Sequence, residues 1–337
     1  FTTGTTGQPK GVVISHQAHL AAVESISEYL KYPNGSRILL ALSPSFDYGL
    51  YQYFLAIHSG SELVVARRPC FPLDLLDLIA KNSISIVPLV PSQWRALANA
   101  DLSGGNSLPQ ICIATSTGSS IDAKLMQAIT KLLPCALFYS MYGLTECKRI
   151  SFLNPDLARL KPTSVGKPMP NCSIRILDSQ SRPVEFGQIG ELVVRGPNVA
   201  SGYWMQISDP SSPFKRDPLS GELELRTGDY FRQDEEGDLF FCGRQDDLVK
   251  AHDTRISLLD VDHYLLALPM VRDAVAFMHS GTQGPRLAAK VVLKPSSLLA
   301  DLRPSLIRRG TPLHFIPQDI EEVAAIPLNA NGKPVRE

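Results

Sequence analysis

Short apolar runs and longer helix-like stretches take turns along the first half of the chain. The apolar runs predict strands at residues 12–14, 37–42, 61–66, 84–89, 110–115 and 136–139. The stretches between them include predicted helices at residues 16–30, 72–81 and 121–133. Strands that alternate with helices are typical of a parallel sheet in an α/β fold.

The pattern changes near residue 172. Short alternating runs at residues 172–177, 191–195, 222–225 and 238–242 are divided by Gly, Pro and Asp, which indicates a β-rich subdomain. Beyond residue 246, a predicted helix at 258–268 precedes strands at 274–278 and 287–293. We therefore predict an α/β part at residues 1–170, a β-rich subdomain at 171–245 and a small α+β domain at 246–337.

Composition and charge exclude several classes of protein. The 337 residues are 44% hydrophobic and 20% charged, with 33 basic and 33 acidic residues, as in a globular protein without a basic surface for nucleic acid or anionic membrane. The six cysteines form no Cys-x-x-Cys pair, which argues against a zinc site or a disulfide scaffold. No apolar run approaches the roughly 20 residues that span a bilayer. We expect a cytoplasmic protein, although a targeting segment can precede Phe1.

The strongest local signal lies at residues 2–11, Thr-Thr-Gly-Thr-Thr-Gly-Gln-Pro-Lys-Gly. A flexible loop rich in N–H and O–H donors can wrap a polyphosphate, and Lys10 adds a positive charge. It is not a Walker A loop, because Pro9 stands where that motif needs its second glycine. The alternative is a Thr/Gly-rich turn before a strand.

Five further segments have residue types suited to nucleotide chemistry. They are Thr-Gly-Ser at 117–119, Tyr-Gly-Leu-Thr-Glu at 142–146, Arg-Thr-Gly-Asp at 226–229, Gly-Arg-Gln-Asp-Asp-Leu-Val-Lys at 243–250 and Pro-Leu-Asn-Ala-Asn-Gly-Lys at 327–333. Taken singly, such segments are more often turns, strand ends or exposed tails. In this order, from Thr2 to Lys333, they resemble the adenylate-forming superfamily, which comprises acyl-CoA synthetases, nonribosomal peptide synthetase adenylation domains and firefly luciferase.

The resemblance implies an enzyme that uses ATP and Mg²⁺, with catalytic residues Lys10, Thr145 and Lys333. Glu146 would hold the magnesium ion, since a carboxylate suits a hard cation. Asp246 would be the hinge about which the small C-terminal domain swings. The implied nucleotide site consists of Thr3, Gly4, Thr5, Thr6, Gly7, Lys10, Gly118, Ser119, Tyr142, Gly143, Thr145, Asp229, Arg244 and Lys333.

The implied reaction activates a carboxylic acid. Its carboxylate attacks the α-phosphorus of ATP, forms an acyl-adenylate and expels pyrophosphate, and a phosphopantetheine or CoA thiol then accepts the acyl group. Charge builds on the phosphate oxygens, so catalysis is mainly alignment and cation placement. In the family, rotation at the hinge opens the path for the thiol.

Ser-Phe-Asp-Tyr-Gly at 45–49 resembles the segment in which amino-acid-activating members place an aspartate. Asp47 in a desolvated pocket would pair with a substrate ammonium, which favours an amino or imino acid. The same pocket would be lined by Tyr48, Tyr51, Met141 and Ile150. Residues 142–151 are similar to stand-alone ligases that load L-proline onto an acyl or peptidyl carrier protein.

Alternatives stay open at this point. Acyl-CoA and aryl-CoA ligases carry a similar Phe-Asp-Tyr-Gly segment, so the acceptor can be CoA instead of a carrier protein. Asp47 can equally be a capping residue at the start of a helix. A third hypothesis is a non-catalytic descendant that binds nucleotide or acyl ligand, although Lys10, Glu146, Asp229 and Lys333 speak against it.

Two features depart from the family pattern. The chain begins at the phosphate loop, whereas family members carry a large N-terminal portion before it, so we expect a partial chain that is aggregated or inactive when expressed alone. Asp253 stands where the family has glycine, and Ser257 where it has glutamate. A Cβ at the glycine position restricts a loop used in thioester formation.

The C-terminal signature gives a first testable prediction. If Lys333 neutralises charge only during adenylation, Lys333→Ala lowers the rate of acid-dependent ATP–pyrophosphate exchange on the order of 10²–10³-fold. Transfer from pre-formed acyl-adenylate to the thiol is spared. An unchanged exchange rate in the variant contradicts the assignment.

Overall fold

Two compact units make up the part of the chain that the computed structural model describes, which is residues 1–3, 9–67, 70–101, 107–205, 212–217, 220–244, 247–251, 254–281, 284–327 and 335–336. The first unit consists of residues 1–228 and 232–241, and the second of residues 229–231 and 242–337. Each unit has its own hydrophobic core.

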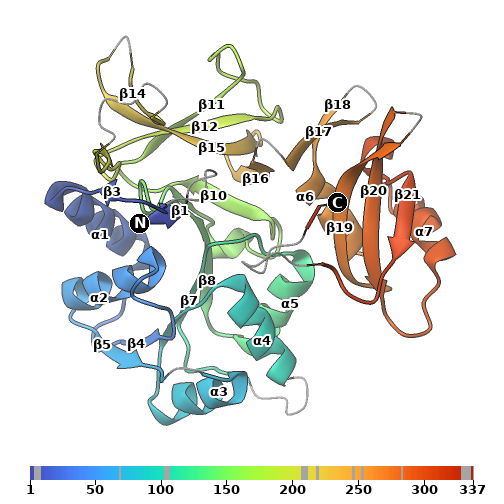
Figure 1. The fold of residues 1–337 in the computed structure, drawn as a ribbon. Helices are drawn as coiled ribbons and strands as arrows, with labels where there is room; N and C mark the ends of the chain where they lie inside the picture. The colour runs from blue at the N-terminus through green and yellow to red at the C-terminus, as the bar shows by residue number, and fades with distance from the viewer. Residues whose placement is uncertain are drawn as a thin grey trace. The chain divides into compact units, whose positions relative to one another are not determined.

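The first unit is built on a sheet of twelve described strands, which has a parallel part, here called the parallel half, and an antiparallel part (Figure 1). The parallel half has the order β5-β4-β6-β7-β8 and consists of β4 (Arg37–Leu40), β5 (Glu62–Val65), β6 (Ile86–Pro88), β7 (Ile113–Ser116) and β8 (Leu137–Tyr142). The helices that connect these strands are α2 (Asp47–Ser59), α3 (Pro72–Lys81), α4 (Pro91–Asp101) and α5 (Ala123–Leu132), and α1 (His16–Leu30) precedes them.

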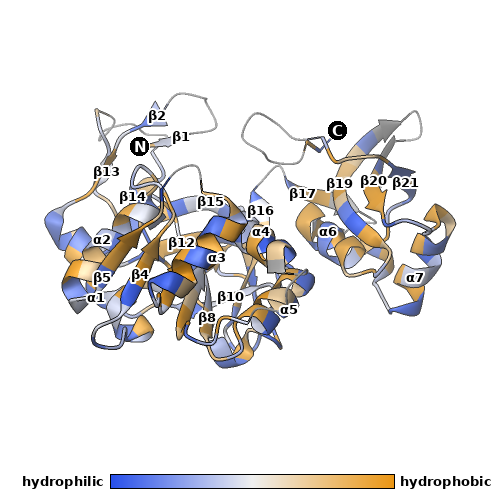
Figure 2. Cartoon of the chain, turned by 90° about the horizontal axis from the view of Figure 1, so that it is seen from below, coloured by the Kyte–Doolittle hydropathy of each residue, from blue (hydrophilic) through white to orange (hydrophobic). Residues whose placement is uncertain are grey.

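Helices cover both faces of the parallel half. Along each strand, successive side chains point to opposite faces, so Ile38 packs under α1 and α2 while Leu39 packs under α3, α4 and α5. The same division separates Ile113 from Ala114 on β7. In Figure 2 these helices carry both hydrophobic and hydrophilic residues, as expected of helices that bury one side. The predicted α/β fold is confirmed.

Antiparallel strands extend the same sheet beyond β8. They follow in the order β9, β10, β16, β15, β12, β11, with β14 paired to β15. Their bounds are β9 (Ser151–Phe152), β10 (Ser164–Pro168), β11 (Ser173–Leu177), β12 (Gly190–Arg195), β14 (Phe214–Arg216), β15 (Leu223–Gln233) and β16 (Leu239–Arg244). The short alternating runs after residue 172 therefore form antiparallel strands of this same sheet.

Short strands near the start of the chain form two pairs. Strand β1 (Thr2–Thr3) pairs with β2 (Pro9–Lys10), and β3 (Val12–Val13) pairs with β13 (Gly202–Tyr203), all antiparallel. A hydrogen bond from Trp204 N to Gly11 O, 2.7 Å long, extends the second pairing. Lys10 is thereby held beside residues almost two hundred positions later in the chain.

The second unit is α+β, as the sequence predicts. Its three-stranded sheet has the order β19-β20-β21, with β19 and β20 antiparallel. Its elements are β17 (Leu248–Ala251), β18 (Thr254–Ser257), α6 (Leu258–Leu266), β19 (Val271–Gly281), β20 (Gly284–Leu293), α7 (Leu302–Arg308) and β21 (Asp319–Glu322). Within the described ranges, no helix combines the length and hydrophobicity needed to cross a membrane.

Local signals explain which helix ends could be predicted. Helix α1 begins after Ser15, whose side chain accepts a hydrogen bond from Ala18 N at 3.0 Å, and α3 begins with Pro72. Both helices have the predicted bounds. Helix α2 is different, because its N-cap residue, Phe46, makes no side-chain cap hydrogen bond. Asp47 is the first helical residue, so the alternative that Asp47 caps this helix is wrong.

The core under α5 gives a prediction about stability. Ile129 on α5 is fully buried, whereas Ile57 on α2 is 80% exposed. Ile129→Ala removes buried methyl groups and leaves a cavity, so it lowers the free energy of unfolding by about 2–5 kcal/mol. The matched control, Ile57→Ala, changes it by less than about 0.5 kcal/mol. Fluorescence of Trp94, buried in the same core cluster as Ile129, reports urea unfolding, and equal losses in the two variants contradict this core assignment.

Candidate active site

The parallel half of the sheet has a topological switch point between β4 and β6. The chain leaves β4 toward β5 on one side of the sheet, and leaves β6 toward β7 on the other. Parallel α/β sheets bind ligands at the carboxyl ends of strands where such a reversal occurs. The segments that follow β4 and β6 are therefore candidates for a binding site.

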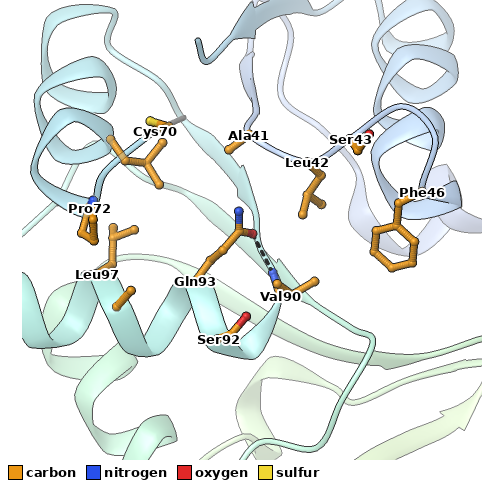
Figure 3. Close-up of a pocket in the computed structure, with 12 residues that line it drawn as sticks. Ala41, Leu42, Ser43, Phe46, Cys70, Pro72, Val90, Ser92, Gln93 and Leu97 are labelled. Carbon is orange, nitrogen blue, oxygen red and sulfur yellow. Dashed lines mark hydrogen bonds between the residues drawn. The ribbon is translucent and has the colours of Figure 1, made fainter. Parts of the chain in front are cut away.

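A cavity of about 590 Å³ lies at this edge (Figure 3). It is lined by Ala41, Leu42, Ser43 and Phe46 after β4, by Cys70, Pro72 and Leu75, and by Val90, Ser92, Gln93, Ala96 and Leu97 after β6. Gln93 Oε1 accepts a hydrogen bond from Val90 N at 3.3 Å, drawn as a dashed line in Figure 3. Phe46 and Val90 also lie beside Gly118, whose φ of +97° is in the region that favours glycine.

The predicted acid-binding residues do not line this cavity. Tyr48, Tyr51 and Met141 belong instead to the core cluster under α1 and α2, and Ile150 is fully buried. The hydroxyls of Tyr48 and Thr115 lie 2.5 Å apart, and Tyr51 Oη lies 2.7 Å from His19 Nδ1. The structure thus brings Tyr48, Tyr51 and Met141 together, with Asp47 at the N-terminus of the same helix as the two tyrosines.

Lys10 and Glu146 are linked through Tyr203. The Lys10 ammonium lies over the Tyr203 ring, 5.1 Å from its centroid, and the Tyr203 hydroxyl donates a hydrogen bond of 2.7 Å to Glu146 Oε1. A cation over the face of an aromatic ring is attracted by the ring quadrupole. Ala200 N also donates to Glu146 O, at 2.8 Å. The predicted phosphate-binding lysine and the predicted metal-binding carboxylate therefore contact one shared side chain.

The turn between β8 and β9 fixes the residues around Glu146. Lys148 N donates to Leu144 O at 2.6 Å, and a Cβ on Gly143 would lie 1.8 Å from Lys148 O. Because real Cβ atoms do not approach a carbonyl oxygen so closely, this turn needs glycine at position 143. Thr145 is half-buried in the same turn.

Tyr142 ends β8 just before this turn. Its ring stacks on that of Phe241, with centroids 6.2 Å apart and planes at 26°. Such a half-buried aromatic ring is suited to stack on a base as well.

Two cations in this turn have no carboxylate partner among the described residues. Lys148 and Arg149 are 7% and 6% exposed. The Arg149 guanidinium lies 5.2 Å from the Tyr48 ring centroid, and Lys148 Nζ lies 5.6 Å from that of Tyr51. Burial lowers the pKa of the Lys148 ammonium, and the charge of Asp47 opposes that shift. Neither cation was assigned a role from the sequence.

The remaining predicted nucleotide residues are found in several places. Thr3 pairs with Pro9 across β1 and β2, and Ser119 is exposed after β7, beside Gly118. In the second unit, Arg244 Nε donates to Asp229 Oδ1 at 3.1 Å, and Asp229 is 3% exposed. Gly4, Thr5, Thr6, Gly7, Asp246, Asp253 and Lys333 lie outside the described residues.

Sequence analysis missed Tyr203, Lys148 and Arg149. Tyr203 was given no chemical role, although its ring contacts Lys10 and its hydroxyl contacts Glu146. A signal for the two cations was present, since a Lys-Arg pair stands between a predicted strand and the apolar residues Ile150 and Phe152.

Comparisons with known proteins identify the family of this chain. Residues 1–204 match the family model described as AMP-binding enzyme. Tyrocidine synthase 2 of Brevibacillus parabrevis is 29% identical over 99% of this chain and 9% of its own length, and novobiocin biosynthesis protein H of Streptomyces niveus is 29% identical over 99% and 55%. The chain thus spans from less than a tenth to about half of these relatives.

A similar solved structure is the O-succinylbenzoate coenzyme A synthetase of Bacillus subtilis in complex with ATP and magnesium ion. It superposes with a TM-score of 0.83 and 27% identity, over 99% of this chain and 68% of that one. The family model covers more than half of the 337 residues. The chain therefore belongs to the AMP-binding enzyme family.

Proposed function

We propose that this chain activates a carboxylic acid with ATP and passes the acyl group to a thiol. The observation that carries the proposal is the contact of Lys10 and Glu146 with opposite parts of Tyr203, the ring face and the hydroxyl. A lysine that binds phosphate and a carboxylate that binds a cation must lie close together if both act on one triphosphate. The Tyr203 contacts support that arrangement.

In the proposed reaction the protein forms no covalent bond to the substrate. A carboxylate oxygen forms a bond to the α-phosphorus while the bond from that phosphorus to pyrophosphate breaks, and the negative charge leaves with pyrophosphate. Lys10 and Lys333 supply positive charge, and the Thr145 hydroxyl donates a hydrogen bond to the α-phosphate. Fixed donors and cations of this kind stabilise the charge that develops in the transition state.

Glu146 fits a magnesium ion held partly by substrate. One of its oxygens is tied to Tyr203, and no described residue hydrogen-bonds to the other. The described residues contain no group of three or more His, Cys, Asp or Glu side chains that could enclose a metal. Mg²⁺ is commonly held by one or two carboxylates plus substrate phosphates, where it neutralises phosphate charge.

The acid we favour is an amino or imino acid such as proline. Asp47 is acidic in the first turn of α2 and lies one helical turn from Tyr51, so both side chains lie on the same face of the helix. A substrate ammonium beside Asp47 gains a charge-assisted hydrogen bond. A relative named dimodular nonribosomal peptide synthase supports a carrier-protein phosphopantetheine as acceptor.

A second candidate is an acyl-CoA or aryl-CoA synthetase. It is favoured by the likeness to the O-succinylbenzoate coenzyme A synthetase over 99% of this chain. The two candidates share the first half-reaction and differ in the acid and in the thiol that accepts the acyl group. Incubation with radiolabelled acid, ATP and either holo-carrier protein or CoA identifies the acceptor by the product that becomes labelled.

The test of the proposed function is acid-dependent ATP–pyrophosphate exchange by the full-length protein. We expect exchange with at least one acid from a panel of amino acids, aryl acids and fatty acids, with L-proline among the best. Exchange with aryl or fatty acids only favours the second candidate. Nucleotide binding without exchange for any acid contradicts both candidates and indicates a non-catalytic descendant.

Asp47 gives the prediction on substrate choice. Asp47→Ala lowers kcat/KM for the preferred amino acid on the order of several hundred-fold, because the substrate ammonium loses its carboxylate partner. The KM for ATP is nearly unchanged. Asp74→Ala is the matched control, since Asp74 is the acidic residue in the first turn of α3. Parental amino-acid kinetics in Asp47→Ala, or a similar loss in Asp74→Ala, contradicts the assignment.

A further inference from the structure

Lys148 is a largely buried residue whose ammonium makes no hydrogen bond with the described residues. It is 7% exposed, and its side chain makes no ion pair or hydrogen bond with them. The contact that it does make is with the Tyr51 ring, and Tyr51 Oη is already within hydrogen-bond distance of His19 Nδ1. An ammonium has three donors and no acceptor. Because Nζ is not one of the fully buried atoms, it is open to a ligand, and an anionic group beside it would gain charge-assisted hydrogen bonds.

The neighbouring Arg149 differs from Lys148 in its surroundings. Its guanidinium lies over the Tyr48 ring and close to Tyr29. Tyr29 in turn packs face to face with Phe152, with ring centroids 3.9 Å apart. Arg149 is thus part of the packing between α1, α2 and the sheet. The Lys148 ammonium lies over the Tyr51 ring, which stacks on His19, and its Nζ is open to a ligand, so Lys148 is the candidate for a ligand contact.

Lys148 lies close both to Asp47, the proposed amine-binding residue, and to the residues proposed to contact magnesium and the α-phosphate. Its ammonium lies over Tyr51, on the helix face that also carries Asp47. Asp47 and Glu146 are close enough to act on it electrostatically. Lys148 is therefore near the residue proposed to bind the amine, and in the same turn as the residues proposed to contact magnesium and the α-phosphate.

The backbone of Lys148 adopts a left-handed conformation that its neighbours maintain. Its φ is +63°, a conformation that costs free energy for a residue with a Cβ. The 2.6 Å hydrogen bond to Leu144 O and the close approach of Gly143 maintain it. A strained position of this kind fixes where the side chain starts relative to Thr145 and Glu146.

We propose that Lys148 binds the reacting carboxylate of the acid substrate and directs it toward the α-phosphate, an inference that rests on the proposed function. With an amino acid bound, the charges alternate from Asp47 to the substrate ammonium, the substrate carboxylate and Lys148. Each charge then has an opposite neighbour, which offsets the cost of removing these groups from water. Lys148 is a substrate-binding residue in this scheme, and Lys333 keeps its role in neutralising phosphate charge.

The kinetic signature of this role is a change in KM for the acid. Lys148→Met keeps the length and bulk of the side chain but removes its charge. We expect the KM for L-proline in ATP–pyrophosphate exchange to rise on the order of ten- to a hundredfold. The KM for ATP and the kcat stay within about threefold, because Lys148 holds the carboxylate equally in the bound substrate and in the transition state. Lys148→Arg, which keeps the charge, retains most of the affinity.

Two substrate fragments separate carboxylate binding from a general disturbance of the pocket. Cyclopentanecarboxylate has the carboxylate of L-proline without the amine, and pyrrolidine has the amine without the carboxylate. As inhibitors of exchange, we expect cyclopentanecarboxylate to be weakened by Lys148→Met and pyrrolidine to be weakened by Asp47→Asn. Lys81→Met, at an exposed lysine on α3, is the control for loss of a lysine.

The outcomes are distinguishable from failure of the proposed function. If the wild-type protein activates benzoate and not L-proline, the amino-acid proposal fails, and the Lys148 variants are tested with benzoate, for which the same rise in KM is expected. An unchanged KM for the activated acid, or equal weakening of both fragments by Lys148→Met, overturns the role of Lys148. If Lys148→Met does not fold, Lys148→Gln, which keeps a donor without the charge, replaces it with the same outcomes.

Discussion

The turn between β8 and β9 is the constraint on which the rest of the site depends. Gly143 approaches the carbonyl of Lys148 so closely that no side chain fits, and the amide of Lys148 closes the turn on Leu144. This turn fixes the backbone positions of Thr145, Glu146, Lys148 and Arg149. Two of these side chains are cations and one is a carboxylate, all of them buried. The turn directly follows β8, the last strand of the parallel half.

Tyrosine side chains contact the charged groups of this site and stabilise them. Tyr203 donates to Glu146 and presents its ring to Lys10, while Tyr48 and Tyr51 present theirs to Arg149 and Lys148. A cation over an aromatic ring is stabilised without a fixed negative charge. The cations therefore stay available to an anionic ligand instead of being neutralised by protein carboxylates. This property suits a site that must bind a carboxylate and a triphosphate together.

Sequence reasoning gave the fold class and the order of the motifs, and it gave element ends where a local signal exists. The bounds of α1 and α3 follow from Ser15 and Pro72, whereas α2 has no capping side chain and its bounds were not predicted. Pairings over long distances could not be predicted, such as β3 with β13, which brings Lys10 to Tyr203. For the same reason Lys148 was not recognised as buried. The domain limits at residues 170 and 245, and the roles of Asp246 and Lys333, stay predictions.

The central claim is that an acyl-adenylate forms, and the fate of the acid's oxygen tests it most directly. Acid labelled with ¹⁸O in its carboxylate is converted to thioester by the full-length protein with ATP and the accepting thiol, and the AMP is examined by ³¹P NMR and mass spectrometry. Because a carboxylate oxygen becomes bonded to the α-phosphorus and stays there when the thiol attacks the carbonyl carbon, the account predicts AMP that carries one ¹⁸O. Unlabelled AMP, or ADP together with labelled phosphate, would contradict it.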